Sequence, residues 1–432
     1  MNSRIRKTLA GLVLLAAVGT VRAGAPQPFS EDLFLDWDGF REALRQEGID
    51  FRVGYVSETA SNLQGGDHTL VRYTDQWTFA TTLDLDTLFS VPHALLKITF
   101  TDRNGRNLSD DARLGSLQQV QELYGRGQTW RTTQFWYGQQ FFGDRLDWKI
   151  GRVTVGEDFA AFSCEFINLT FCGAQPGNLV GSYWYNWPVS QWATRVRANI
   201  KGFGYVQLGA FEVNPSYLQT GHALGLGDPA GATGVLAPFE IGWLPTFGSK
   251  LDGSYKVGGW YNSSRGADVV ENTRGQPLEL FGGTPRTHAG QYGGYINFLQ
   301  RLTTPEAGSK RGVRAFLNVT FADRETSTLD NQVALGLLAT GLLDARPEDD
   351  IGLAFGRTHV NSRVAEVERL QNAAGLGPVG VQTSEYVGEL FYSFNPAIWI
   401  NLRPSLQYVH QPGGIAHDTD DVVVGVRVSI NL

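Results

Sequence analysis

The chain ends on "VVVGVRVSINL", Val422 to Leu432. Every second residue of this stretch, starting from its first, is apolar, whereas the residues between them are mostly small or polar. An alternation of period two places one face of a β-strand in an apolar medium and the other in a wetter one. The segment therefore predicts a long terminal strand, with Arg427 and Asn431 on its polar face.

The same alternation recurs throughout the chain. It defines about sixteen segments of roughly ten residues each, the length that a tilted strand needs to cross a bilayer. We place them at 50–60, 72–86, 94–102, 129–141, 146–155, 191–201, 203–214, 237–247, 251–262, 290–302, 311–323, 331–343, 350–359, 384–394, 397–410 and 421–432.

The connections between these segments alternate between short and long. Several are tight turns, such as a single glycine at 202 and "NP" at 395–396. The long ones are 103–128, 156–190, 215–236, 263–289 and 360–383. Outer-membrane barrels have short turns on one rim and long loops on the other. A secreted sandwich or propeller also alternates in hydrophobicity, but it does not predict this asymmetry.

We therefore predict an all-β fold, a transmembrane antiparallel barrel of about 16 strands. Trp and Tyr residues near many strand ends are typical of the aromatic girdles of such barrels. In the terminal strand, the side chains expected to contact lipid are Val424, Val426, Val428, Ile430 and Leu432.

The N-terminus has the pattern of an export signal. "MNSRIRKTLAGLVLLAAVGTVRA" combines a basic start, a short apolar stretch and small residues before Gly24. The alternative is a membrane anchor, but the apolar stretch is short for a span. We predict a signal peptide at 1–23, cleaved after Ala23. It holds four of the 36 Lys and Arg residues and none of the 43 acidic ones, so the remaining chain carries a net charge of −11. This charge argues against nucleic acid as a partner.

Residues 24–49 are predicted to form a periplasmic segment that precedes the barrel at 50–432. Within it, "DWDGFREALRQEGIDF" predicts a short amphipathic helix. Phe40, Leu44 and Ile49 lie on one side of this helix, and Gly48 ends it.

The two cysteines, Cys164 and Cys172, lie close together in "FSCEFINLTFCG". In an exported protein this spacing predicts a loop disulfide, and the absence of nearby His or further Cys argues against a metal site. The seven His residues are scattered and no G-x-S-x-G surrounds a serine, so we predict no enzyme activity and no cofactor. "DTDD" (Asp418 to Asp421) is interpreted as a solvated acidic tip rather than a cation site.

Several motifs resemble one known family. The first motif, Trp37-x-Gly39-x-Arg41-x-x-Leu44, lies in the segment before the first strand. Further motifs follow it in the same order as in that family. These are "SETASNLQGG" (57–66), "KIGRVTVGEDFA" (149–160), "FINLTFCGAQPG" (166–177) and "GSYWYNWPVSQWATRVR" (181–197). Together they resemble the carbohydrate-selective porin (OprB) family of Gram-negative outer membranes. The resemblance implies a monomeric sixteen-stranded barrel through which sugars diffuse, narrowed by inward loops with charged and aromatic side chains.

Two loops are candidates for this constriction, 103–128 and 156–190. In the first, Ser109 is expected to cap a short helix with Leu114, Leu117 and Val120 on one side. A partly apolar loop of this kind should pack inside the barrel. The disulfide would hold the second loop compact.

A pore for monosaccharides needs charged groups for the hydroxyls beside an aromatic surface for the sugar face, and it must bind weakly. Our candidates for these roles are Arg103, Arg106, Arg131, Lys149, Arg152, Glu157, Asp158, Trp184, Trp187, Arg195 and Arg197. Trp184 is the first choice for the aromatic surface and Trp187 the second. Strict alternation sends Arg152 toward lipid, unless a bulge or the end of the strand changes its direction.

Three functions therefore remain open. The first is a sugar-preferring porin, the second a general or anion-preferring porin, and the third a plugged structural or secretion barrel. The expected partners are sugars, outer-membrane lipid and the outer-membrane assembly machinery. The terminal strand resembles the signal that this machinery reads, although such signals usually end in Phe and this one ends in Leu432.

Overall fold

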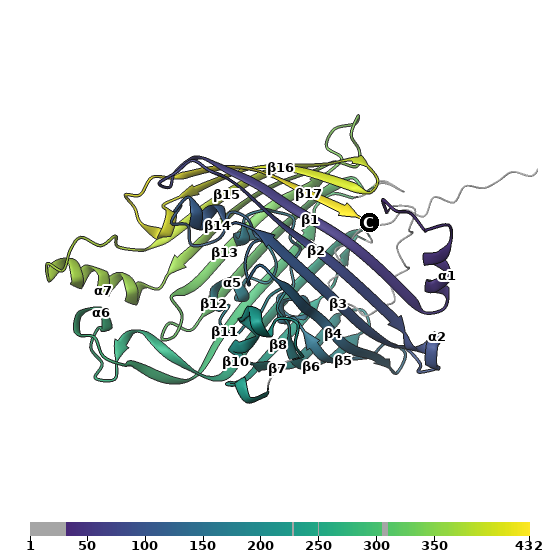
Figure 1. Cartoon of the computed structure of the whole chain (residues 1–432), viewed down its shortest axis with the longest axis horizontal. Helices are drawn as coiled ribbons and strands as arrows, with labels where there is room; N and C mark the ends of the chain where they lie inside the picture. The colour runs from purple at the N-terminus through teal and green to yellow at the C-terminus, as the bar shows by residue number, and fades with distance from the viewer. Residues whose placement is uncertain (1–31, 227–228, 249, 305–309) are drawn as a thin grey trace, which may run out of the picture.

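The chain folds into a closed antiparallel β-barrel, seen from the side in Figure 1. This computed structural model describes residues 32–226, 229–248, 250–304 and 310–432. Sixteen long strands form the wall, and the short β9 (Thr246–Phe247) pairs only with β10. The wall strands are β1 (Ile49–Gln64), β2 (Val71–Asp84), β3 (Ala94–Gly105), β4 (Trp130–Phe141), β5 (Leu146–Val153), β6 (Gln191–Ile200), β7 (Gly204–Val213), β8 (Gly234–Trp243), β10 (Leu251–Asn272), β11 (Pro285–Arg301), β12 (Gly312–Ala322), β13 (Leu329–Thr340), β14 (Asp350–Val360), β15 (Ser384–Ala397), β16 (Ile400–His410) and β17 (Asp421–Asn431).

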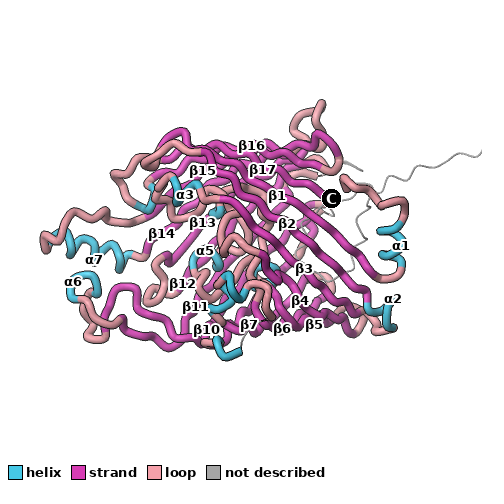
Figure 2. Tube along the Cα trace, viewed as in Figure 1, coloured by secondary structure: helices cyan, strands magenta, loops and turns pink. Residues whose placement is uncertain are grey.

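Helices are short and lie at the ends of the strands and in the loops, as Figure 2 shows. They are α1 (Phe40–Gln46), α2 (Leu85–Phe89), α3 (Leu108–Asp111), α4 (Val155–Asp158), α5 (Pro176–Leu179), α6 (Leu278–Phe281) and α7 (Ser362–Ala373). Single 3₁₀ turns form η2 (Leu169–Phe171), η3 (Pro215–Leu218), η4 (Thr220–His222), η5 (Pro229–Gly231) and η6 (Pro412–Gly414). Within the described ranges, no helix is long and apolar enough to cross a membrane.

The terminal strand closes the barrel. β17 pairs antiparallel with β16 on one side and with β1 on the other, so that Gly54 lies opposite Asn431. Val426 is 41% exposed on the outer face, as expected for a lipid contact. Leu432, in contrast, is buried (9% exposed). Its N–H donates to Val53 O (3.0 Å) and its carbonyl accepts from Arg41 Nη1 (3.3 Å). The prediction that Leu432 contacts lipid is therefore wrong.

All sixteen predicted segments form wall strands, and the short N-terminal helix is present as α1. Two long connections contain more regular structure than predicted. Most of 263–289 continues β10 and β11 as a long hairpin, and 360–383 contains α7. The predicted signal peptide lies outside the described residues.

The helix predicted after Ser109 is also different in the structure. α3 is a single turn, capped by Asn107, whose side chain accepts from the N–H of Ser109 (3.0 Å). Leu114 and Val120 are nevertheless buried inside the barrel together with Leu108 and Val423. The apolar residues therefore dock the loop without forming a helix. Buried loop N–H groups find other polar partners instead, as Val120 N does by donating to Ser109 Oγ (3.2 Å).

Candidate functional site

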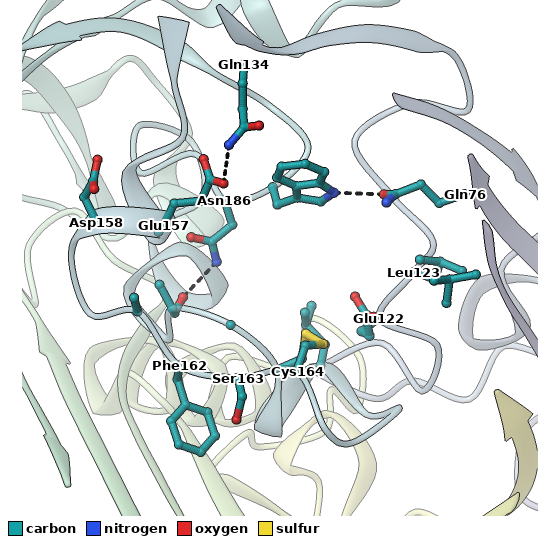
Figure 3. Close-up of a pocket in the computed structure, with 18 of the residues that line it drawn as sticks. Gln76, Glu122, Leu123, Gln134, Glu157, Asp158, Phe162, Ser163, Cys164 and Asn186 are labelled. Atoms are coloured by element: carbon teal, nitrogen blue, oxygen red, sulfur yellow. Dashed lines mark hydrogen bonds between the residues drawn. A yellow bond between two sulfur atoms is a disulfide. The ribbon is translucent and has the colours of Figure 1, made fainter. Parts of the chain in front are cut away.

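A cavity of about 620 Å³ lies inside the barrel, between the wall strands β2–β5 and the two inward loops. Its charged lining consists of Lys97, Arg103, Glu122, Lys149, Glu157, Asp158 and Arg427. Its amide and aromatic lining includes Gln76, Gln134, Trp136, Phe162, Asn186 and Trp187. In Figure 3, Gln76, Glu122 and Leu123 lie across the cavity from Gln134, Glu157 and Asp158.

Asp158 holds the second inward loop to the wall. Lys149 Nζ donates to both of its carboxylate oxygens (2.8 and 3.0 Å), and Arg195 Nη2 lies 3.4 Å from one of them. All three side chains are buried. Burial alone would raise the pKa of Asp158, but the charges of Lys149 and Arg195 bring it below its ordinary value. Asp158 therefore ionises more readily than a free aspartate, and its contacts fix the direction of Lys149.

Glu157, the preceding residue on α4, turns toward the cavity. Gln134 Nε2 donates to Oε1 of Glu157 at 2.6 Å (Figure 3). Thr154 Oγ1 donates to Oε2 of Glu157, also at 2.6 Å. Burial raises the pKa of Glu157 above its ordinary value, and the charge of Lys149 only partly opposes this effect. The pKa values of these two neighbouring carboxyl groups are thus shifted in opposite directions.

Arg103 and Trp187 meet at one amide on the opposite side of the cavity. Arg103 Nε donates to Gln76 Oε1 at 2.8 Å, and Trp187 Nε1 donates to the same oxygen at 3.0 Å. The shared acceptor fixes a guanidinium beside an indole. Groups that can form hydrogen bonds with sugar hydroxyls therefore lie next to an apolar ring. A sugar requires this combination, because its edge carries hydroxyls and its face carries C–H groups.

The disulfide between Cys164 and Cys172 is present and contributes to the cavity lining. Beside it, Arg427 of the terminal strand pairs with Glu122 of the first loop (3.0 Å) and donates to Cys164 O (3.4 Å). One arginine on the wall thus contacts both inward loops, and the predicted polar face of the terminal strand points into the barrel.

Glutamate side chains of the wall strands point into the barrel and accept hydrogen bonds from backbone N–H groups of both inward loops. Glu389 accepts from Ile167 N and Asn168 N (both 2.9 Å), and Glu240 accepts from Ala160 N (2.9 Å). On the first loop, Glu58 accepts from Leu123 N (3.2 Å) and Glu385 accepts from Leu117 N (2.6 Å). Loop N–H groups that would otherwise be buried without partners are satisfied in this way.

Five of the residues predicted from the sequence line the cavity: Arg103, Lys149, Glu157, Asp158 and Trp187. Arg106 does not, because its side chain is 67% exposed and pairs with Asp111 at 2.8 Å on the rim. Arg131 points inward but is used by a loop, since its Nη1 donates to Tyr217 O at 2.8 Å.

Arg152 is the last residue but one of β5. Its position at the end of the strand explains why its side chain need not face lipid. Its guanidinium donates to Ser190 O and Gly225 O (both 2.9 Å) and lies 4.2 Å from the centre of the Tyr217 ring. Loop backbone therefore covers an arginine that strict alternation would direct toward lipid.

Trp184, Arg195 and Arg197 lie in the packed interior and do not line the cavity. Trp184 is completely buried (0% exposed) against Trp260 and Tyr295, so it offers no open face. Arg195 binds Asp147 (2.8 Å), and the guanidinium of Arg197 stacks 3.5 Å from the centre of the Tyr205 ring. The indole that reaches the cavity is that of Trp187.

Several lining residues were not among the sequence candidates, including Gln76, Lys97, Glu122, Gln134 and Trp136. A signal for three of them was present in the sequence. Gln76, Lys97 and Gln134 are polar residues that alternate with apolar ones on predicted strands. Glu122 has no such signal, because it lies in a loop without a periodic pattern.

Comparisons with known proteins agree with this geometry. Residues 68–432 match the carbohydrate-selective porin, OprB family. The chain is 40% identical to Porin B of Pseudomonas aeruginosa over 440 residues, which cover 98% of this chain and 97% of that protein.

Solved structures lead to the same family. The high-pH structure of Pseudomonas putida OprB is 40% identical to the chain, covers 95% of it and is itself covered completely, with a TM-score of 0.90. The low-pH structure of that protein is 28% identical and has a TM-score of 0.60, with 94% of this chain and all of that chain covered. The chain belongs to the carbohydrate-selective porin (OprB) family, the outer-membrane sugar porins of Gram-negative bacteria.

Proposed function

We propose that the protein lets monosaccharides of the glucose type diffuse passively through a narrow passage, and that the cavity between the two inward loops is its selective part. The observation that carries this proposal is the meeting of Arg103 and Trp187 at Gln76, opposite Glu157. This arrangement supports recognition of a neutral polyol better than recognition of an ion.

Both signs of charge line the cavity, four cations and three carboxylates. An anion-selective constriction would be expected to carry an excess of one sign. Arg and Lys donate hydrogen bonds to hydroxyls, and the carboxylates and amide oxygens accept from them. The volume of about 620 Å³ lies within the range usual for small-molecule sites.

Most of the charged groups are already paired within the protein, as in Lys149 with Asp158 and Arg427 with Glu122. A sugar therefore gains little by replacing these partners, so its binding stays weak. Weak binding supports passage, because a sugar must leave as readily as it enters.

The proposal includes the setting of the pore. We propose that the N-terminal signal is cleaved, that the barrel is inserted by the outer-membrane assembly machinery, and that it works as a monomer surrounded by lipid. The exposed apolar side chains on the outer face of the strands support the lipid contact, among them Leu208, Val257, Leu335 and Leu406.

Uptake into liposomes that contain the purified protein tests this function. We expect glucose to enter much faster than a trisaccharide and faster than gluconate, which is similar in size but anionic. Faster entry of gluconate would favour the anion-preferring porin, and equal rates for all three solutes would favour the general porin. If no solute enters, the barrel is plugged.

A further inference from the structure

Asp421, the first residue of β17, is a buried carboxylate without a partner. Its side chain is 0% exposed, and neither oxygen meets a hydrogen-bond donor. Among the residues that the structure describes, it is the one carboxylate with both oxygens buried and unpaired. Such a group is costly unless a positive charge or a proton compensates it.

Glu385 lies near the same end of the barrel interior. Asp421 pairs with Val409 of β16, and Val409 pairs with Val387 of β15, so Glu385 is two residues further along the same inward face. Its Oε2 accepts from Leu117 N (2.6 Å) and Gly413 N (3.1 Å). Its Oε1 is buried and has no donor.

Three carboxylates act on Asp421 with negative charge, those of Glu385, Asp420 and Asp418. Asp420 already accepts from the backbone N–H of Gln411 (3.1 Å) and contacts His410 (2.9 Å). Within the described part of the chain, no Lys or Arg pairs with Asp421 or Glu385 in a salt bridge. The "DTDD" stretch is therefore more than an exposed acidic tip, because its last residue turns inward.

Loop backbone packs directly against the Asp421 carboxylate. A Cβ added to Gly65 would lie 1.8 Å from Asp421 Oδ1, so only glycine leaves room for the carboxylate there. The site thus combines free carboxylate oxygens with the close backbone of the turn after β1. It contains oxygen ligands and lacks His and Cys, which is the preference of a hard divalent cation.

We propose that Asp421 and Glu385 bind one divalent cation of the Ca²⁺ class, with backbone oxygens and water completing its coordination. The ion ties β17 to β15 at the loop end of the barrel. Through Glu385 it also supports the first inward loop, which is held there by Leu117 N. Its role is structural and does not depend on which solute the pore carries.

Protein refolded without lipopolysaccharide, so that no lipid-bound calcium is present, tests the site. Urea unfolding is measured in EDTA and in Ca²⁺, with NaCl added to keep ionic strength equal. At 100 times its dissociation constant, Ca²⁺ should lower the unfolding equilibrium constant about 100-fold. Asp421→Asn should remove this response and should be no less stable than wild type in EDTA, because the amide carries no buried charge.

Asp67→Asn is the matched control, because Asp67 is an exposed carboxylate of the neighbouring turn that already pairs with Arg113 (3.0 Å). It should keep the full Ca²⁺ response. Equilibrium dialysis of the folded wild type against radioactive calcium adds a measurement that needs no variant, and it should give one ion per chain. No bound ion, or a response that survives in both Asp421→Asn and Glu385→Gln, would overturn the proposal. A wild type stabilised by acid but not by Ca²⁺ would also overturn it and would indicate a protonated Asp421.

Discussion

The interior of the barrel has two different halves, and the second inward loop contributes to both. Toward β2–β5, it presents Glu157, Asp158 and Trp187 to a polar cavity. Toward β12–β16, it buries Phe166 and Phe171 among apolar side chains of the wall. The polar half suits a passage for solutes, whereas the aromatic half fixes the loop that shapes it.

The two halves hold the loop by different forces. In the aromatic half, the Phe166 ring lies 4.9 Å from that of Phe391 and 5.2 Å from that of Phe171, centre to centre. Burial of such rings is non-directional and strong. In the polar half, the Asp158 carboxylate must meet Lys149 and Arg195 in one geometry. We infer that apolar packing places the loop inside the barrel, and that ion pairs orient the side chains that this loop presents to the cavity.

Removing the central carboxylate should have the largest effect. Asp158→Ala leaves Lys149 and Arg195 buried without their shared acceptor, so we expect a loss of about 4 kcal/mol in the free energy of unfolding in urea. Glu157→Gln keeps one acceptor and the neighbouring ion pair, so its loss should be below about 1 kcal/mol. Equal losses in the two variants would show that the ion pairs do not anchor the loop.

Emptying the aromatic half should have the next largest effect. Phe166→Ala creates a cavity under the loop and should cost about 3 kcal/mol in urea unfolding. The matched control is Phe355→Ala on β14, whose ring is 55% exposed on the outer face. Phe355→Ala, measured in detergent, should lower the free energy of unfolding in urea clearly less than Phe166→Ala does. A loss as large for Phe355 as for Phe166 would remove the distinction between packed and outward-facing rings.

A substitution of Trp187 tests whether the polar half binds sugar. Trp187→Ala removes the ring beside Arg103 and should weaken glucose binding roughly fivefold, which corresponds to about 1 kcal/mol. The measurement is the glucose concentration that halves the ion current in a planar bilayer. Trp192→Ala, at an outward-facing indole that is 37% exposed, should leave this concentration unchanged.

The smallest effect concerns pH. Because burial raises the pKa of Glu157 above its ordinary value of 4.5, this group takes up a proton in the folded protein before a free glutamate would. Its contribution to stability is thus complete below pH 4.5 and is lost as pH rises through the raised pKa. Asp158 stays charged over this range, so acidification removes one negative charge from the cavity.

The cation-to-anion permeability ratio should therefore fall modestly as pH is lowered from 7 toward 4.5. Glu157→Gln should flatten this dependence, because the titrating group is gone. A pH dependence that is unchanged in this variant would assign the titration to another group.

Strand periodicity was sufficient to predict the wall, because the side chains of a strand alternate wherever lipid covers one face. The loops were less predictable. Trp184 and Trp187 are three residues apart in one aromatic stretch, yet only Trp187 reaches the cavity. The choice between them depends on the path of the loop, which is fixed by wall residues such as Glu389 that are far away in the sequence. Arg106 was misplaced for a more local reason, because its ion pair with Asp111 of the same loop holds it on the rim.

The central claim is that sugar passes beside Arg103, through the polar half of the barrel interior. Reduction of the single-barrel ion current by glucose tests it most directly, measured for wild type, Arg103→Ala and Arg106→Ala. We predict that the half-maximal glucose concentration rises about tenfold in Arg103→Ala, because a charged hydrogen bond contributes about 1.5 kcal/mol, and that it is unchanged in Arg106→Ala. The account would be contradicted if glucose left the wild-type current unchanged, or if the two arginine variants behaved alike.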